Sequence, residues 1–220
     1  MNFSNFPFEE LPFIVLVLLI AFTVHEFAHA YSAYKFGDDT AYREGRVSLN
    51  PMVHLDWLGF ILIIIAGFGW AKPVPVRASR FKNPRVMSVI VSLVGPLSNL
   101  VLGIISIIAF VILAKTGLLY AGSDGVTNAL VLFFGLMIQY NFLLFVFNLI
   151  PLPPLDGYRI VSEFLPLRTR YKLDQNAHWG SIIFLLIVFI PPLRAVTITP
   201  VLMLGQNMSE SIMTFFISIL

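Results

Sequence analysis

The sequence contains no cysteine among its 220 residues. This absence excludes disulfide bonds, zinc sites built from thiolates and catalysis by a cysteine nucleophile. It also leaves the redox compartment open, because cysteine usage is the sequence feature that separates oxidising from reducing environments.

Charge is scarce as well, since Asp, Glu, Lys and Arg make up 12% of the residues and hydrophobic residues 58%. Soluble domains carry about 25% charged residues. With a mean hydropathy of +0.86, the composition indicates a membrane protein. The net charge of +2 is too small to favour a nucleic-acid partner. The N-terminal "MNFSNFPFEE" has no basic residue and no cleavage site follows, so we expect the first apolar run to be a retained transmembrane helix.

Long apolar runs predict the membrane topology, because about 20 apolar residues are needed to cross the hydrocarbon core. Three runs meet this length, at about 11–34, 86–114 and 128–150. The stretch 57–70 is too short to span and predicts a re-entrant or interfacial element. The Pro-rich, basic stretch that follows, "AKPVPVRASRFKNPR", favours an extended hairpin or a loop over a helix.

The C-terminal third allows more than one topology. Residues 179–205 form either one span broken at Pro191-Pro192 or two short ones, and the last apolar stretch, 209–220, is short. We therefore predict an all-α integral membrane protein of about four to six membrane segments, with a short re-entrant or β-hairpin element between the first two spans. We expect a single membrane-embedded domain over 1–220, with a catalytic core at about 11–165 and C-terminal membrane segments at about 179–220.

Basic residues cluster in two loops and predict an orientation. Twelve of the fourteen follow the first span or the third: Lys35, Arg43, Arg46, Lys72, Arg77, Arg80, Lys82 and Arg85, then Arg159, Arg168, Arg170 and Lys172. The N-terminal end instead carries Glu9 and Glu10. The positive-inside rule makes both loops cytoplasmic. The first helix then runs inward, toward the cytoplasm.

The stretch "TVHEFAHAYSAY" contains His25, Glu26 and His29 in the pattern His-Glu-x-x-His. Residues four apart share one helix face, so the two histidines can bind one metal ion. Glu26 lies about 100° around the helix, beside such an ion, where it can take a proton from bound water. The alternative is that all three are polar residues on a bundle-facing helix side. Ionisable groups inside a span are costly and usually functional, which favours the metal site.

Catalytic zinc needs a third protein ligand and an open position for water. His54 and His178 are available, but both fit an interfacial polar role. Asp156 is the better candidate, because the three prolines in "FNLIPLPPLDGYRI" forbid a regular helix just before it. Irregular backbone at membrane depth is tolerated where it is buried in protein or lines a wet cavity. The orientation also brings this end of the third span to the level of His25 and His29.

Taken together, these segments resemble the site-2 protease family of intramembrane metalloproteases. "HEFAH" lies in the first long helix, "GPLSN" in the second and "NLIPLPPLDG" at the end of the third. The intervening "GRVSLNPMVHLDWLG" and "GFGWAKPVPV" are similar to the compact prokaryotic branch that lacks a PDZ domain. The resemblance covers about residues 20–165 and less of the last 50.

The resemblance implies one catalytic Zn²⁺ held by His25, His29 and Asp156, with Glu26 as the catalytic base. It also points to Asn148 as a catalytic polar group near the reacting carbonyl, where a neutral amide donor can stabilise an oxyanion. An interhelical hydrogen bond is the equal alternative for Asn148. Asn99 either packs against the first helix or hydrogen-bonds behind a zinc ligand. Asn141 and Gln139 are expected to make interhelical polar contacts.

The expected activity is hydrolysis of peptide bonds in or near transmembrane segments of membrane proteins, at the cytoplasmic side of the cell membrane. The expected partners are these substrate segments and the lipid bilayer, with no nucleic acid and no prediction of oligomeric state. A substrate helix must unwind to be cut, and either "REGRVSLN" or "AKPVPV" can pair with it as a neighbouring strand. The alternatives are a divalent-metal transporter and a non-catalytic relative that binds membrane helices.

Overall fold

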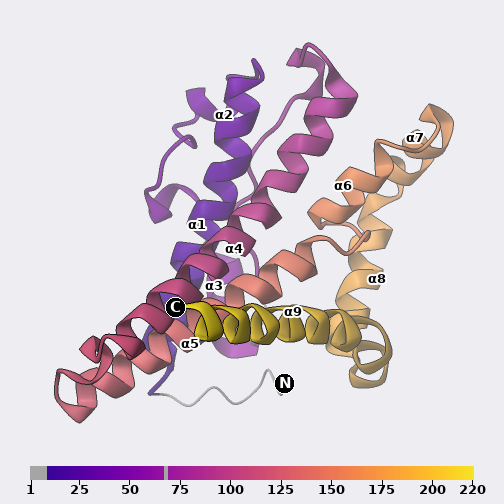
Figure 1. Ribbon diagram of the computed structural model, residues 1–220. Coiled ribbons are helices and arrows are strands. Elements are labelled where there is room, and N and C mark those ends of the chain that lie inside the picture. The colour runs from indigo at the N-terminus through magenta and orange to yellow at the C-terminus, as the bar shows by residue number, and fades with distance from the viewer. Residues whose placement is uncertain (1–8, 67–68) are drawn as a thin grey trace.

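Three long helices form the body of the protein. The computed structural model describes residues 9–66 and 69–220 (Figure 1). The long helices are α1 (Leu11–Lys35), α4 (Pro84–Lys115) and α5 (Asp124–Asn148). Each contains a window apolar enough to cross a membrane, with mean hydropathy of at least 2.2. The three long apolar runs of the sequence are thus confirmed as helices.

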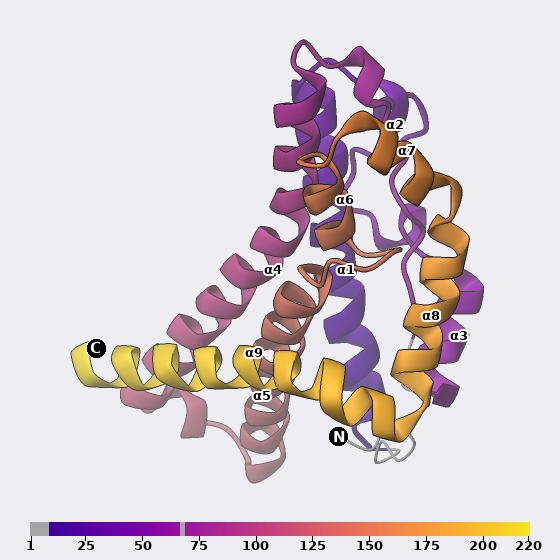
Figure 2. The same ribbon diagram turned by 90° about the vertical axis from the view of Figure 1, so that its right-hand side faces the viewer.

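The C-terminal part consists of α8 (Ala177–Phe189) and α9 (Pro191–Ile219), which are bent by 96° at the break between them. Pro191 and Pro192 stand in the first turn of α9, where a missing N–H costs no hydrogen bond. Figures 1 and 2 show α9 running across α4 and α5. The described residues therefore hold three candidate spans, or four if the bent pair counts as one. The expected four to six segments are not confirmed.

The remaining elements are short. They are α2 (Thr40–Arg43), η1 (Pro51–Val53), α3 (Trp57–Ala66), η2 (Ala78–Arg80), η3 (Leu118–Tyr120), α6 (Asp156–Ser162) and α7 (Leu167–Gln175). The ten residues of α3 extend about 15 Å, half of the hydrocarbon thickness, so this helix cannot span. No strand occurs in 9–66 or 69–220, so the β-hairpin alternative is not confirmed. Residues 71–77 instead form an irregular segment, because two of them are prolines without an N–H for a ladder.

Local sequence determines where α4 and α5 begin and end. Asn83 caps α4 by accepting a hydrogen bond from the backbone N–H of Val86, with Pro84 in the first turn. α5 ends at Asn148, shortly before the three prolines of "IPLPPLDG", and α6 starts at Asp156. The break between α5 and α6 therefore places Asp156 at a helix start, directed back toward the bundle.

Tight side-chain packing holds the long helices together. In lipid, the hydrophobic effect gives little drive for helix association, so close van der Waals contact must supply it. Phe142 of α5 is buried against Ile107 and Val111 of α4 and shows how close this packing is. A Cβ at Gly103 would lie 2.7 Å from its ring. A second cluster joins α1 to α5, through Ile14, Val17, Leu18, Leu136 and Met137. These contacts fix α1 and α4 around the polar side chains described next.

Candidate metal centre

His25 and His29 lie one turn apart on α1 and turn their rings toward the same point. Both are buried, with 6% and 7% of their surface exposed. Their Nε2 atoms are 3.0 Å apart. The i, i+4 spacing of the sequence thus places two imidazole nitrogens together, as predicted.

Asp156, at the start of α6, completes a cluster with the two histidines. Its Oδ2 lies 3.1 Å from Nε2 of His25 and 3.2 Å from Nε2 of His29. The three residues are buried and form a group of the kind that can bind a metal ion. The structure therefore brings together the three side chains that the sequence proposed as ligands, from segments 127 residues apart.

The Nδ1 atoms of His25 and His29 each lie within hydrogen-bond distance of an acceptor oxygen. Nδ1 of His25 lies 2.7 Å from Oδ1 of Asn99, and Nδ1 of His29 lies 2.6 Å from the carbonyl oxygen of Val91. Because a carbonyl can only accept, each Nδ1 carries the proton and donates it. The Nε2 lone pairs then point at one another and at a carboxylate oxygen. Such an arrangement is repulsive unless a metal ion or a further proton lies between these atoms.

These residues fit zinc. Ligand atoms about 2.0–2.1 Å from a tetrahedral zinc ion are separated by about 3.3 Å, and the three separations here are 3.0–3.2 Å. Two imidazoles and one carboxylate are also a ligand set of catalytic zinc sites, which keep the fourth position open.

Asn99 hydrogen-bonds behind a candidate ligand, which decides between the two roles expected for it. Its side chain is fully buried, and its Nδ2 donates to the carbonyl oxygen of Ala21 at 3.2 Å and to Oδ1 of Asn141 at 3.0 Å. Asn141 in turn donates to Met137 within α5. This chain joins α1, α4 and α5, and it confirms the interhelical contact expected of Asn141.

Glu26 stands beside the cluster and outside it. Its Oε2 accepts a hydrogen bond of 3.1 Å from the backbone N–H of Val74, in the irregular segment that follows α3. One carboxylate oxygen is therefore oriented by the backbone, while the side chain lines the same cavity as His25.

Asn148 also lines this cavity, at the C-terminal end of α5. Its Nδ2 donates to the carbonyl oxygen of Leu144 at 3.0 Å, a bond within its own helix. Among residues 9–66 and 69–220 this bond is the one found for the Asn148 side chain, so the interhelical hydrogen bond that was its alternative is not confirmed. Its role near a reacting carbonyl remains a prediction.

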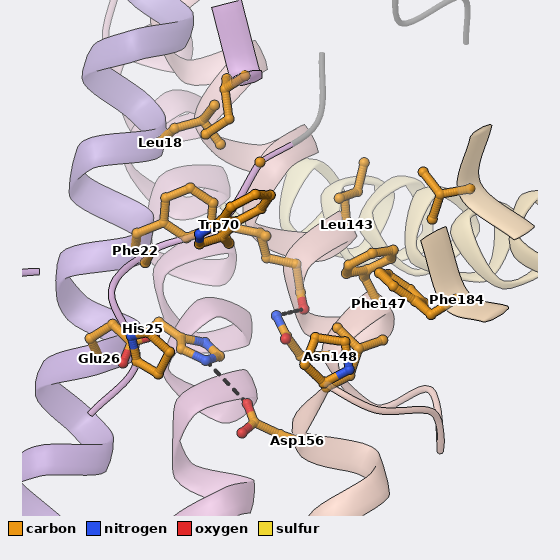
Figure 3. Close-up of a pocket in the computed structure, with 18 of the residues that line it drawn as sticks. Leu18, Phe22, His25, Glu26, Trp70, Leu143, Phe147, Asn148, Asp156 and Phe184 are labelled. Carbon is orange, nitrogen blue, oxygen red and sulfur yellow. Dashed lines mark hydrogen bonds and ion pairs between the residues drawn. The ribbon is translucent and has the colours of Figure 1, made fainter. Parts of the chain in front are cut away.

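A cavity of about 440 Å³ opens next to the cluster. Figure 3 shows His25, Glu26 and Asp156 facing it from one side. Aromatic side chains line much of the rest: Phe22, Trp70, Phe147 and Phe184. The cavity thus combines a few polar groups with a mostly apolar lining, as binding sites for apolar segments do.

The two other histidines lie apart from the cluster. His54 is buried, its Nε2 is 2.8 Å from the carbonyl oxygen of Ser48, and burial lowers its pKa. His178 contacts the ring of Trp179 on α8. Neither belongs to the metal-binding group, in line with the preference for Asp156.

Sequence reasoning missed two neighbours of His29. Val91 contributes only its backbone carbonyl, which no side-chain pattern reveals. Gly95 approaches so closely that an added Cβ would lie 2.2 Å from Nε2 of His29. The glycine of "GPLSN" was a signal for this close approach, although its partner could not be read from the sequence.

Comparisons with known proteins agree with this site. The family model of Peptidase family M50 matches residues 118–190. "Putative zinc metalloprotease YwhC" of Bacillus subtilis is 46% identical over 220 residues, covering 99% of this chain and 97% of that protein. The protein of the same type named Rip2, from Mycolicibacterium smegmatis, is 31% identical over 196 residues, 86% of this chain and 72% of that protein. MJ0611 of Methanocaldococcus jannaschii is 30% identical over 163 residues, 73% and 75% of the two chains. No solved structure gives a significant match.

Relatives named as zinc metalloproteases, together with a buried cluster of metal-binding type, place this chain among the metalloproteases. The similarity to YwhC runs through nearly the full length of both proteins, including the C-terminal third that the sequence motifs leave out. The chain belongs to Peptidase family M50, the site-2 protease family.

Proposed function

We propose that this metalloprotease is a zinc-dependent intramembrane endopeptidase, which hydrolyses peptide bonds in or near transmembrane segments of other membrane proteins. One observation carries the proposal. A cluster of metal-ligand type and a glutamate meet in one cavity, between helices that are apolar enough to cross a membrane. A protease site at that depth is suited to a substrate that is itself in the membrane.

His25, His29 and Asp156 are the proposed ligands of the zinc ion. Zinc bound there would polarise the scissile carbonyl and lower the pKa of a bound water to about 7. The hydrogen bonds from Nδ1 of both histidines fix the rings and increase the basicity of Nε2. Asn99 and the Val91 carbonyl therefore act as supports of the ligands.

Glu26 is the proposed general base. It accepts the proton of the attacking water as a general base and later donates it to the leaving amine as a general acid. Its hydrogen bond with Val74 keeps the carboxylate at the cavity. Asn148 is proposed to donate to the oxyanion through the second N–H of its amide, since the first donates to the carbonyl of Leu144.

The segment "AKPVPV" is the better of the two candidates for pairing with an unwound substrate. Ala71, Pro73, Val74 and Val76 line the cavity, whereas no residue of "REGRVSLN" does. Val74 lines the cavity and its N–H also binds Glu26. A substrate strand that pairs with this segment therefore passes beside Glu26. We propose that the carbonyls of this segment receive N–H groups that the substrate frees when its helix unwinds.

We propose that the site opens toward the cytoplasm. The support is the charge distribution, because twelve of the fourteen basic residues lie either between the last residue of α1 and the first turn of α4 or in residues 159–172 after α5. Water would then enter from the cytoplasmic side, and the bilayer would deliver the substrate segment. The cell membrane is the proposed location.

No observation favours the transporter alternative. A transport path needs ionisable groups at several depths. Within residues 9–66 and 69–220, His25, His29 and Asp156 form the one cluster of three or more side chains that could hold a metal ion.

Cleavage of a designed single-span substrate tests the proposal. The purified protein is incorporated into lipid vesicles with the substrate, and mass spectrometry locates the cut. We expect cleavage within or at the border of the apolar segment, lost on zinc chelation and restored by zinc. A cut that falls only in soluble loops of the substrate would contradict the intramembrane assignment. His25→Ala and Asp156→Ala should each abolish stoichiometric zinc.

A further inference from the structure

One wall of the cavity is formed by a short irregular segment, residues 70–76, which we call the cavity wall. Trp70, Ala71, Pro73, Val74 and Val76 of this wall face the cavity. The Val74 N–H also holds Oε2 of Glu26. The position of the wall therefore decides both the shape of the cavity and the orientation of the proposed base.

Two hydrogen bonds hold the wall at Lys72, one through its backbone N–H and one through its backbone carbonyl. The Lys72 N–H donates to the carbonyl oxygen of His54 at 2.8 Å, and the Lys72 carbonyl accepts from Nη2 of Arg46 at 2.5 Å. Pro73 and Pro75 have no N–H to add. Among residues 72–75, only Lys72 and Val74 can donate from the backbone, so few bonds fix the wall.

Arg46 is buried at a cost in stability. It is 2% exposed, burial lowers its pKa, and its Nε has no hydrogen-bond partner in the described structure. A guanidinium carries five N–H donors, and leaving a buried one unpaired is unfavourable. Glu26 and Glu44 are the acids that act on it electrostatically, yet neither forms an ion pair with it within residues 9–66 and 69–220. The Lys72 carbonyl is thus its main polar contact.

His54 also holds Lys72 in place, through the Lys72 N–H. Its ring hydrogen-bonds with the carbonyl of Ser48 at 2.8 Å, and its own carbonyl receives the Lys72 N–H. Since burial lowers the pKa of His54, the ring is neutral near pH 7 and its Nε2 donates. The loop between α2 and α3 thereby offers the wall one fixed acceptor and one fixed donor.

We propose that Arg46 is a positioning residue for catalysis, which holds the Lys72 carbonyl so that the cavity wall keeps Val74 against Glu26 and presents its edge to the substrate. This role rests on the proposed function of Glu26. It gives a role to a charged side chain that is buried at a cost in desolvation. It also gives a purpose to a basic residue that the positive-inside rule alone would leave on the surface.

Replacement of Arg46 tests the proposal with zinc-loaded protein and the single-span substrate. For Arg46→Gln we expect kcat/KM to fall about 100-fold, because a displacement of about 1 Å costs that much, while zinc content stays at the wild-type value. Arg46→Lys keeps a donor but not the planar fork, so we expect an intermediate loss of about tenfold. Arg43→Gln is the matched control, since Arg43 lies three residues away with its side chain 72% exposed, and its kcat/KM should not change.

A double-mutant cycle separates positioning from a general loss of structure. Val74→Pro removes the N–H that binds Glu26 and should lower kcat/KM about 10–100-fold. If Arg46 acts through the wall, adding Arg46→Gln to Val74→Pro causes little further loss. Losses that multiply, or wild-type activity of Arg46→Gln, would overturn the proposal. If Arg46→Gln does not fold, Arg46→Lys takes its place in the cycle, with the same two contrary outcomes. Failure of the wild-type protein to cleave would instead refute the proposed function.

Discussion

Replacing Asn99 with alanine is expected to weaken zinc binding about 10–100-fold, the usual effect of losing a hydrogen bond behind a metal ligand. The substitution removes the acceptor 2.7 Å from Nδ1 of His25, so the ring loses its fixed tautomer and orientation. It also leaves the fully buried Oδ1 of Asn141 without its donor, whereas the Ala21 carbonyl keeps its hydrogen bond within α1. Each buried unpaired group costs about 1–3 kcal/mol, so the melting temperature should fall as well.

Competition with a zinc-binding dye measures the affinity, and cleavage at saturating zinc measures what remains of the activity. Saturating zinc should restore much of the activity of Asn99→Ala, because the three ligands are intact. Ser106→Ala is the matched control, since Ser106 is buried on the same helix and its hydroxyl donates within that helix, to the carbonyl oxygen of Leu102. Zinc affinity of Asn99→Ala equal to that of Ser106→Ala would refute the assigned role.

Three further substitutions follow from close contacts and charge. Gly95→Ala should abolish zinc binding, measured as zinc per protein, because the new Cβ would lie 2.2 Å from Nε2 of His29, whereas Gly135→Ala, with nothing within 4 Å, should bind zinc normally. Gly103→Ala should lower stability by about 1–3 kcal/mol through its clash with the α5 packing, seen in thermal unfolding, without loss of bound zinc. Asp156→Asn removes the one negative ligand and should leave zinc substoichiometric, and a normal zinc content would contradict the ligand set.

The candidate site could be predicted largely from the sequence, because its determinants are local. The i, i+4 spacing of His25 and His29 follows from helix geometry once the segment is known to be a helix. The proline-broken end of α5 marks a place where backbone and water can meet, and the structure confirms that Asp156 reaches the two histidines there. The distribution of basic residues then predicted that the C-terminal end of α5 lies at the same membrane depth as His25 and His29.

The contacts behind the site could not be predicted in the same way. Asn99 had two open roles because its partner depends on how α4 crosses α1, which side-chain packing decides. Arg46 was counted with the basic loop residues, since a charge tally contains no information on burial. Its burial arises only when the segment after α3 folds back over the loop.

The topology was predicted less well than the grouping of His25, His29 and Asp156. Length and hydropathy identify apolar helices of about 20 residues or more, and α1, α4 and α5 are of this kind. They do not fix the direction of shorter ones, so the bend between α8 and α9 left the span count open. Of the two expected forms of the segment after α3, the hairpin is not confirmed, because the prolines of the Val-Pro alternation lack the N–H donors of a strand ladder.

The central claim is that Glu26 activates water at a zinc ion held by His25, His29 and Asp156. Cleavage of the single-span substrate by zinc-loaded Glu26→Gln tests it most directly, with zinc content determined in the same sample. We expect one zinc per protein and a cleavage rate at least about 100-fold below that of the wild type, the range for losing a general base. Cleavage at the wild-type rate by zinc-loaded Glu26→Gln would contradict the account.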